Sequence, residues 1–288
     1  MAQLTRRDVL LAGLALPGFA GALYRDAPGD DRSLKPKRFE ETAGFELAEV
    51  VESHFLAILP LGSLEFHGPH PLGSDSIIIS GIAERVAART GGLLFPIIQF
   101  TQCPAHTAHF RGTISVRPEV MTMYFADVLR NILHLGFRKV FILNGHDGNI
   151  GPGRGAIAQV ADETKDAALL LVSWWEFLPS EMMKTLGMFR QTNGGHGHGG
   201  PLETSAVAAF RPDLIHLEKA HDLPEPPDLS GGAPYFLQKS AAADWPGYSG
   251  QVSEASAEKG KRLVEISEDG IVKLIENWLK HDEVPGSW

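Results

Sequence analysis

One short segment in the first third of the chain carries side chains that could hold a metal ion. It combines two carboxylates, Glu65 and Asp75, with two imidazoles, His67 and His70. Hard and borderline divalent cations choose this mixture of oxygen and nitrogen ligands. The segment directly follows the apolar run 55–61, which predicts a buried parallel strand. Because open α/β sheets place their sites at the carboxyl ends of the strands, the pattern indicates a metal-dependent enzyme.

A second cluster follows another apolar run, residues 139–143. His146 and Asp147 lie there in the sequence Asn-Gly-His-Asp-Gly-Asn, where the flanking glycines let the backbone turn sharply. A turn at the end of a central strand would bring both side chains to the same sheet edge as Glu65 and His67. The alternative is an ordinary turn, because Asn, Asp and Gly favour turns in any case. Its position after a strand favours the functional interpretation.

A third cluster is a glycine-rich loop with two histidines, His196 and His198, followed by a helix predicted over residues 201–211. Glu203 lies in the first turn of that helix, where the helix dipole favours a carboxylate even without a metal. The alternative for the histidines is a flexible loop that binds cations adventitiously. Three such clusters in one chain favour a single built site over three unrelated features.

The rest of the chain alternates between strand and helix patterns. Short apolar runs bounded by turn residues predict strands, and apolar residues at helical spacing predict helices. Successive β and α elements with short links predict a mostly parallel sheet covered by helices on both faces, a three-layer α/β/α fold. Pro96 places the second strand at an edge of the sheet or near an end. The predicted strands cover residues 55–61, 93–98, 139–143 and 169–172, the predicted helices cover residues 76–90, 118–135, 157–163, 201–211 and 260–280, and a long Pro- and Gly-rich loop covers residues 222–250.

Composition and charge narrow the range of partners. The 288 residues are 43% hydrophobic and 21% charged, which suits one main globular domain. The formal net charge of -9 is spread along the chain, which argues against a nucleic-acid or anionic-membrane partner and favours small solutes. Cys103 is the only cysteine, so no intrachain disulfide can form and thiolate zinc sites are excluded. On this reasoning, any metal must be held by His, Asp and Glu.

The first residues are interpreted as an export signal. Paired arginines, Arg6 and Arg7, precede an apolar stretch that ends in Ala-Gly-Ala, so residues 1–22 resemble a twin-arginine signal peptide. The alternative is an ordinary N-terminal helix. Residues 23–40 then form a solvated linker, and residues 41–288 form the mature domain. We therefore expect a periplasmic or otherwise exported protein with no membrane span after signal removal.

The three clusters together resemble the creatininase family of metal-dependent amidohydrolases. The shared motifs are Glu-x-His-Gly-Pro-His with Leu-Gly-Ser-Asp, then Asn-Gly-His-x-Gly-Asn, then His-x-Gly-x-x-Glu-Thr-Ser, in that order. Supporting matches are the segments 110–115, 247–250 and 257–260, so the resemblance runs from about residue 50 to about residue 275. It implies a creatininase-like α/β/α fold, a homo-oligomer that is usually a hexamer, and two adjacent divalent ions such as Zn, Mn or Fe. The implied substrates are small cyclic amides, formamides or unusual peptide bonds.

The resemblance also implies a role for each matching residue. Glu65 and His146 would hold one ion, His67 would hold the other, and Asp75 would bridge the two. Such a pair of ions can hold a hydroxide between them, because each cation lowers the pKa of bound water. That hydroxide is the expected nucleophile.

Two further residues match family positions in the glycine-rich loop and the helix after it. His198 matches the family histidine that handles protons near the scissile group. Glu203 matches a carboxylate that ligates the second ion or orients the water. Both are therefore expected to take part in catalysis.

Three departures from the family pattern affect this transfer. The segment between Glu65 and Asp75 is one residue shorter than usual, so the bridging geometry depends on a tightened loop. Creatininase itself has a carboxylate at the position matching Gly148, so Glu203 or Asp147 must supply that oxygen ligand. Arginine stands at position 111, where proline is common. These differences argue against creatinine as the substrate.

Substrate-binding residues are predicted on the same rim. Trp174 and Trp175 follow the strand 169–172 and would form a wall of the pocket together with His70. The alternative for the two tryptophans is packing in partly buried positions. His106 and His109 are predicted to line the cavity without touching the metals.

The leading hypothesis is a binuclear metal-dependent amidohydrolase that uses a metal-bound hydroxide on a small-molecule amide. One alternative keeps the metals but hydrolyses an ester, a lactone or a phosphate, or acts as a peptidase. Another is a periplasmic metal- or solute-binding protein, in which the same ligands store a cation without turnover. Activity against a panel of amides and esters would separate these functions.

Overall fold

The computed structural model describes residues 35–164, 166–179, 197–224 and 244–280. The predicted signal peptide 1–22 and most of the linker 23–40 lie outside these residues, as does His196. Much of the predicted loop 222–250 lies outside them as well.

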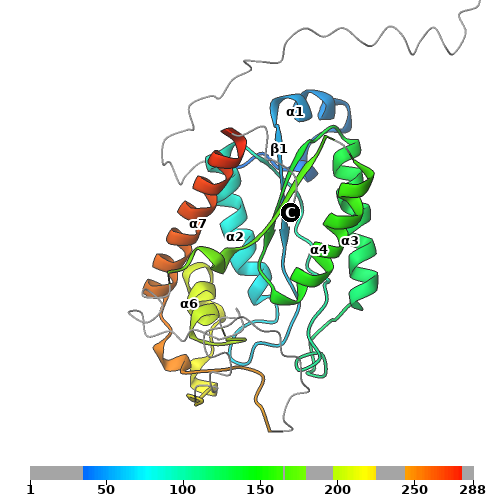
Figure 1. Ribbon diagram of the computed structural model, residues 1–288. Coiled ribbons are helices and arrows are strands. Elements are labelled where there is room, and N and C mark those ends of the chain that lie inside the picture. The colour runs from blue at the N-terminus through cyan, green and yellow to red at the C-terminus, as the bar shows by residue number, and fades with distance from the viewer. Residues whose placement is uncertain (1–34, 165, 180–196, 225–243, 281–288) are drawn as a thin grey trace, which may run out of the picture.

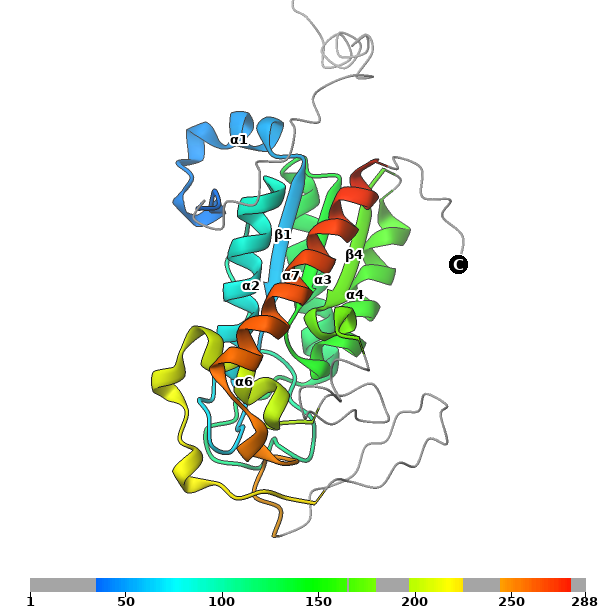
Figure 2. The same cartoon turned by 90° about the vertical axis from the view of Figure 1, so that its left-hand side faces the viewer.

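The centre of the molecule is a four-stranded, all-parallel sheet in the order β2-β1-β3-β4. Strands β1, β3 and β4 are in register, so that Leu61, Asn144 and Ser173 lie side by side at their carboxyl ends. The lower end of the sheet in Figures 1 and 2 is therefore one shared edge. The strands are β1 (Leu56–Leu61), β2 (Leu93–Leu94), β3 (Lys139–Asn144) and β4 (Ala168–Ser173).

Helices cover both faces of the sheet, which confirms the three-layer α/β/α prediction (Figure 1). Alternate residues of β1 point to opposite faces, because side chains of a strand alternate. Leu56 and Ile58 pack against α2, α6 and α7, whereas Ala57 and Leu59 pack against α3 and α4. The helices are α1 (Leu47–Ser53), α2 (Ser74–Thr90), α3 (Pro118–His134), α4 (Ile150–Glu163), α6 (Pro201–Phe210) and α7 (Ala257–Lys280).

Short 3-10 helices link several of these elements, and two of them follow strands at the shared edge. They are η1 (Phe39–Glu41), η2 (Gly44–Glu46), η3 (Asp147–Asn149), η4 (Trp174–Phe177), η5 (Pro212–Leu214), η6 (Leu217–Lys219) and η7 (Val252–Glu254).

The largest differences in length from the sequence prediction are in two elements. Strand β2 contains only two residues at the sheet edge, because Pro96 cannot donate a ladder hydrogen bond. Helix α4 begins at Ile150, seven residues earlier than the apolar pattern at 157–163 indicates. Its first turns are rich in glycine, which hides the helical pattern. At Gly153 a Cβ would lie 3.1 Å from Leu171, so this glycine lets α4 pack closely on β4.

None of the helices in the described part of the chain has the length and apolar character needed to cross a membrane.

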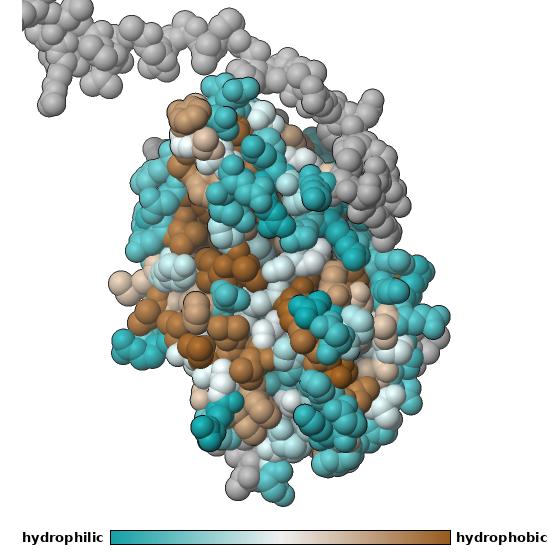
Figure 3. Space-filling model, turned by 180° about the vertical axis from the view of Figure 1, so that it is seen from behind, coloured by the Kyte–Doolittle hydropathy of each residue, from teal (hydrophilic) through white to brown (hydrophobic). Residues whose placement is uncertain are grey.

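Apolar residues gather in the middle of the face shown in Figure 3. Val120, Met123 and Tyr124 of α3 are among the large apolar side chains that are exposed.

Candidate metal centre

The loop between β1 and α2 folds back on itself beside the shared sheet edge. The Glu65 N–H donates to the Leu72 carbonyl at 2.8 Å, and His67 and His70 form an isolated antiparallel bridge. This compact turn accommodates the shortened segment. It ends at helix α2, whose first turn contains Asp75, where the helix dipole favours a carboxylate.

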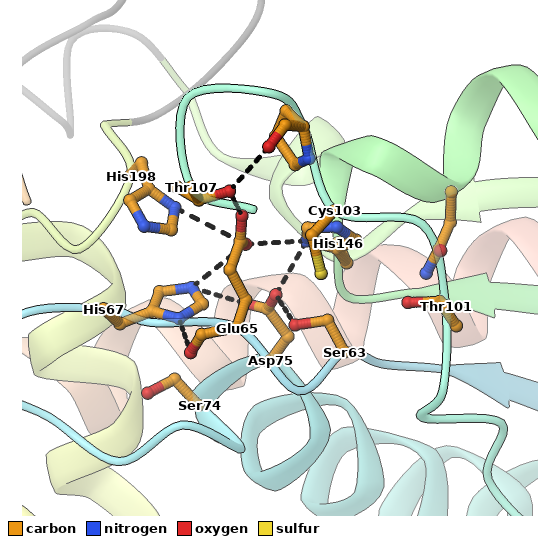
Figure 4. A network of polar contacts seen from close by, with 12 residues as sticks. Ser63, Glu65, His67, Ser74, Asp75, Thr101, Cys103, Thr107, His146 and His198 are labelled. Carbon is orange, nitrogen blue, oxygen red and sulfur yellow. Dashed lines mark hydrogen bonds and ion pairs between the residues drawn. The ribbon is translucent and has the colours of Figure 1, made fainter. Parts of the chain in front are cut away.

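Asp75 lies between two imidazoles that come from different strands. Its Oδ1 is 3.3 Å from His67 Nε2, and its Oδ2 is 2.8 Å from His146 Nδ1. The Ser63 hydroxyl donates to Oδ2 at 2.7 Å and holds the carboxylate in this orientation (Figure 4). Asp75 thus has the geometry of a bridging ligand, with one oxygen for each side.

Glu65 and Glu203 extend the cluster on either side of Asp75. Glu65 Oε2 is 3.4 Å from His146 Nδ1 and 3.6 Å from His198 Nδ1, and Thr107 donates its hydroxyl proton to Oε1. Glu203, in the first turn of α6, places Oε2 3.7 Å from His67 Nε2 and accepts the Gly199 N–H at 2.8 Å. The two carboxylates therefore face different imidazoles.

The three imidazoles share one hydrogen-bonding pattern. His67 donates Nδ1–H to the Glu65 carbonyl at 2.9 Å, and His146 donates Nε2–H to the Gln102 carbonyl at 2.9 Å. His198 donates Nε2–H to the Phe66 carbonyl at 2.7 Å. In each ring the other nitrogen faces carboxylate oxygens. This is the arrangement in which a protein orients histidine ligands toward a metal.

The cluster also contains buried polar atoms without a hydrogen bond. Among the described residues, Glu65 Oε2 and His67 Nε2 have no hydrogen-bond partner although they are buried. Such orphaned atoms are costly unless something occupies the space between them, and a divalent cation would satisfy both. The residues present therefore fit a metal. Three sets have ligand atoms within 4.8 Å of one another: Glu65 with His67 and His198, Glu65 with Cys103 and His146, and His67 with Asp75 and Glu203.

Comparison with known proteins assigns this chain to a family. The sequence model of the creatininase family, described as creatinine amidohydrolase, matches residues 40–275. The chain belongs to the creatininase family. This confirms the family resemblance that the three motifs indicate.

Several characterised proteins are similar to this chain in sequence. The creatinine amidohydrolase of Pseudomonas putida is 28% identical over 239 residues, covering 79% of this chain and 91% of the relative. The mycofactocin precursor peptide peptidase of Mycobacterium ulcerans is 30% identical over 232 residues, covering 77% and 84%. The 3-dehydro-scyllo-inosose hydrolase of Thermotoga maritima is 29% identical over 254 residues, covering 80% and 79%.

Solved structures of creatininase share the fold. A creatininase described as the Mn form superposes with a TM-score of 0.73 at 26% identity, covering 84% of this chain and 98% of the other. A creatininase mutant described as the Zn-Zn type gives a TM-score of 0.73 at 27% identity with the same coverage. The fold is therefore creatininase-like, and the named metals belong to those proteins.

Charges in this creatininase-family site determine where protons reside in the absence of an ion. Burial opposes a charge on His67, yet Asp75 and Glu203 raise the pKa of its imidazole to about 10. Burial raises the pKa of Glu203 to about 8, against the effect of His67. Although burial acts in the opposite direction, His67 and His146 hold the pKa of Asp75 well below its usual range. A divalent cation would compete with these protons for the same lone pairs, so binding releases protons.

His198 differs from the other two histidines. Burial, assisted by the positive charge of His67, lowers the pKa of His198 to about 4, although Glu65 acts against this. Its imidazole is therefore neutral near pH 7, with the Nδ1 lone pair directed at the cluster. This position suits a group that accepts a proton.

The structure distinguishes the two candidates for the missing carboxylate. Glu203 joins a three-residue set with His67 and Asp75, whereas Asp147 is exposed and belongs to none of the sets among the described residues. At Gly148 a Cβ would lie 2.3 Å from the Gln102 carbonyl oxygen and 2.5 Å from His146 Nε2. No side chain fits there while that carbonyl orients His146.

The predicted pocket residues occupy different surroundings. Trp174 is 1% exposed, and its carbonyl accepts the Ser267 hydroxyl proton, while Trp175 contacts it edge-on at 6.1 Å. Both indoles lie in the hydrophobic core, which is the packing alternative; a substrate contact for them stays a prediction. His70 is buried and lines a cavity of about 450 Å³ together with residues such as Phe66 and Tyr248.

Sequence patterns miss several residues that the fold brings to the site. Trp245 places its ring 5.9 Å from His198 and 5.6 Å from His106, so it is an aromatic side chain at the cluster. Thr107 is 42 positions from Glu65 in sequence, and no local pattern indicates their hydrogen bond. His109 is exposed, and its ring lies 4.4 Å from that of Phe110 in a tilted arrangement.

Cys103 also lies at the cluster. Its sulfur belongs to one of the three potential ligand sets, with Glu65 and His146. A single cysteine can complete a mixed set even where a site of several thiolates is impossible. The expectation that any metal is held by His, Asp and Glu alone therefore stays a prediction.

Proposed function

We propose that the protein is a binuclear metal-dependent amidohydrolase acting on a C–N bond of a small cyclic amide, a formamide or a related compound. One observation carries the proposal: three imidazoles, two of them buried, each give one N–H to a backbone carbonyl and direct the other nitrogen at shared carboxylates. Without a cation or extra protons, lone pairs would face one another across the cluster.

These contacts support two adjacent positions for ions. Glu65 and His146 would hold the first ion and His67 and Glu203 the second, with Asp75 supplying one oxygen to each. The choice of two divalent ions, zinc or manganese, is supported by the creatininase structures described as Zn-Zn and Mn forms. Iron is a further option from the family resemblance.

The ions would supply an activated water and polarise the amide carbonyl. The chain supplies proton transfer and orientation. Because the Phe66 carbonyl fixes the tautomer of His198, its Nδ1 is free to take a proton and deliver it to the leaving nitrogen. Glu203 holds its position through the Gly199 N–H and can orient the water. Trp245 lies against His198, where it would exclude bulk water from the proton acceptor.

The decisive experiment combines metal analysis with a substrate panel. We expect two ions per chain in the purified protein and turnover on one of the amide classes: cyclic amides, formamides or C-terminal peptide amides. Esters and lactones in the same panel test the alternative hydrolase. Tight metal binding without turnover on any compound would favour a binding protein instead.

A matched pair of variants separates the site from general effects. His67→Ala should lose metal and activity while its circular dichroism stays close to wild type. His134→Ala, an exposed histidine at the end of α3, should change neither. Full activity in His67→Ala would contradict the assignment.

We also infer export and self-assembly. Residues 1–22 would direct the folded protein through the twin-arginine route, and replacing both Arg6 and Arg7 by lysine should retain the protein inside the cell. The relatives in the family and the exposed apolar side chains of α3, such as Met123, support a homo-oligomer, with a hexamer expected from the family resemblance. Light scattering of the wild type and of Met123→Lys tests the assembly.

A further inference from the structure

We propose that the sulfur of Cys103 is an additional ligand of the ion held by Glu65 and His146, and that it makes this position prefer zinc or cobalt over manganese. The inference rests on the proposed function, because it requires an ion at that position. It concerns a residue outside the ligand set that the family resemblance implies.

The placement of Cys103 is fixed from both sides of its backbone. Its N–H donates to the Ser115 hydroxyl at 2.9 Å, and its carbonyl accepts the Ser115 hydroxyl proton at 3.1 Å. The preceding carbonyl, that of Gln102, accepts the His146 Nε2–H at 2.9 Å. One short segment therefore orients both the imidazole and the thiol toward the same place.

The sulfur lies close to two other ligand atoms in a closed environment. Cys103 is 3% exposed, and its Sγ lies within 4.8 Å of a Glu65 carboxylate oxygen and a His146 ring nitrogen. The thiol has two long hydrogen-bond contacts, at 3.9 Å to the carbonyl oxygens of Leu64 and Ile114. Figure 4 shows the thiol beside His146, on the side of the cluster away from His67.

An independent observation indicates that something fits between these atoms. Glu65 Oε2 is buried and has no hydrogen-bond partner in the described part of the chain. An ion bound to sulfur at about 2.3 Å and to nitrogen at about 2.0 Å places those two ligands roughly 3.6 Å apart. The ligand atoms of Cys103, Glu65 and His146 lie no more than 4.8 Å from one another, so one ion can be shared among them after a modest approach. On binding, the S–H bond breaks, a sulfur–metal bond forms, and the proton leaves to solvent.

The two ion positions would then differ in their ligands. The set of His67, Asp75 and Glu203 offers only nitrogen and oxygen, which manganese accepts as readily as zinc does. The set with Cys103 adds a soft sulfur, which favours zinc and cobalt. We therefore expect a mixture of zinc and manganese to load unequally, with zinc at the position nearer His146.

Cobalt substitution provides a readout that does not depend on activity. Cobalt bound to a thiolate gives a charge-transfer band in the near ultraviolet, in addition to its visible ligand-field bands. Because Cys103 is the only cysteine of the chain, such a band can come from no other residue. We expect it in wild type and expect Cys103→Ser to lose it while retaining both cobalt ions.

Competition between metals gives a second measurement. Cys103→Ser should shift the ratio of zinc to manganese bound from an equimolar mixture by about tenfold toward manganese. Ser53→Ala, which removes an exposed hydroxyl at the end of α1, is the control and should leave the ratio unchanged.

The outcomes separate this inference from the proposed function. Ligand-field bands without a charge-transfer band would overturn the role of Cys103 and leave the metal site standing. If no cobalt binds at all, the proposed function fails as well. If Cys103→Ser loses its helical circular dichroism, the wild-type cobalt spectrum alone still decides whether Cys103 is a ligand, because that measurement needs no variant.

Discussion

The two halves of the candidate metal centre differ in how far they are closed to solvent. On one side, the side chains of Glu65, Asp75 and His146 are at most 5% exposed. On the other, the side chains of Glu203 and His198 are 18% and 16% exposed. The closed half is built from ends of the two central strands and the first turn of α2, whereas the open half comes from α6 and the glycine-rich loop before it.

This difference assigns separate tasks to the two halves. A ligand set that emerges from β1, β3 and α2 is positioned by rigid elements and can hold an ion in a fixed place. A set on a loop and a helix start leaves room for a substrate to approach and for a proton to move. We expect substrate to enter on the side of His198 and Glu203, with Trp245 as a wall.

Replacing the carboxylate that lies between the two proposed ion positions should have the largest effect. Asp75→Ala removes an oxygen ligand from each position and leaves His67 and His146 facing an empty space. We expect the loss of both ions and of all measurable turnover, with elemental analysis and an amide assay as readouts. Retention of one ion would show that the two positions are independent and that Asp75 does not bridge them.

A substitution in the open half should separate chemistry from metal binding. His198→Gln removes the proton acceptor, so kcat should fall by about 10²- to 10⁴-fold while the metal content stays at the wild-type value. Steady-state kinetics and elemental analysis on the same sample provide the check. If the metal content falls in parallel, His198 is a ligand instead of a proton carrier.

A substitution that removes a hydrogen bond to a residue of the closed half should have a smaller effect, on the affinity for metal. Thr107→Val keeps the shape of the side chain but removes the hydrogen bond that orients Glu65. The affinity for the first ion should weaken by about 10- to 100-fold, measured by competition with a chromophoric chelator. Thr122→Val, whose hydroxyl bonds within α3, should leave the affinity unchanged. Equal metal affinities in the two variants would show that the hydrogen bond from Thr107 does not control the orientation of Glu65.

The pH dependence of stability should show the smallest effect. Folding raises the pKa of His67 to about 10, so the stability that its proton contributes is complete below about pH 6.5 and is lost as the pH rises to 10. Glu203, with a pKa of about 8, adds a loss of the same sign between about pH 4.5 and 8. The metal-free protein should therefore lose about 4 °C or more in Tm between pH 7 and pH 10, measured by calorimetry. The metal-loaded protein should lose less, because the ion replaces these protons; parallel curves would contradict this.

Much of the fold could be predicted because its signals are local. The apolar runs of β1, β3 and β4 and the helical spacing in α2 and α3 each lie within one segment of chain. The prediction failed on length where local signals conflict. Proline shortens β2, and the glycines needed for close packing of α4 on β4 conceal its first turns.

The candidate site also contains some residues whose position could be predicted from the sequence and others whose position could not. Glu65, His67, Asp75 and His146 could be placed together because they follow parallel strands or begin the next helix, and such strand ends share an edge. The surroundings of Trp174 could not be predicted, because a tryptophan after a strand is equally compatible with a pocket wall and with a core. Its burial against α7 depends on a helix about ninety residues later.

The sequence by itself determined the family, the parallel α/β/α layout and the side chains that meet at the strand ends. It could do so because the order of the motifs and the hydrophobic pattern are properties of the sequence itself. Only the tertiary structure decided that Glu203 joins the cluster while Asp147 does not, that Gln102 and Thr107 orient its ligands, and that Cys103 and Trp245 lie beside it. These contacts join loops far apart in the chain, so their geometry depends on how α6 and the segment before α3 pack against the sheet edge.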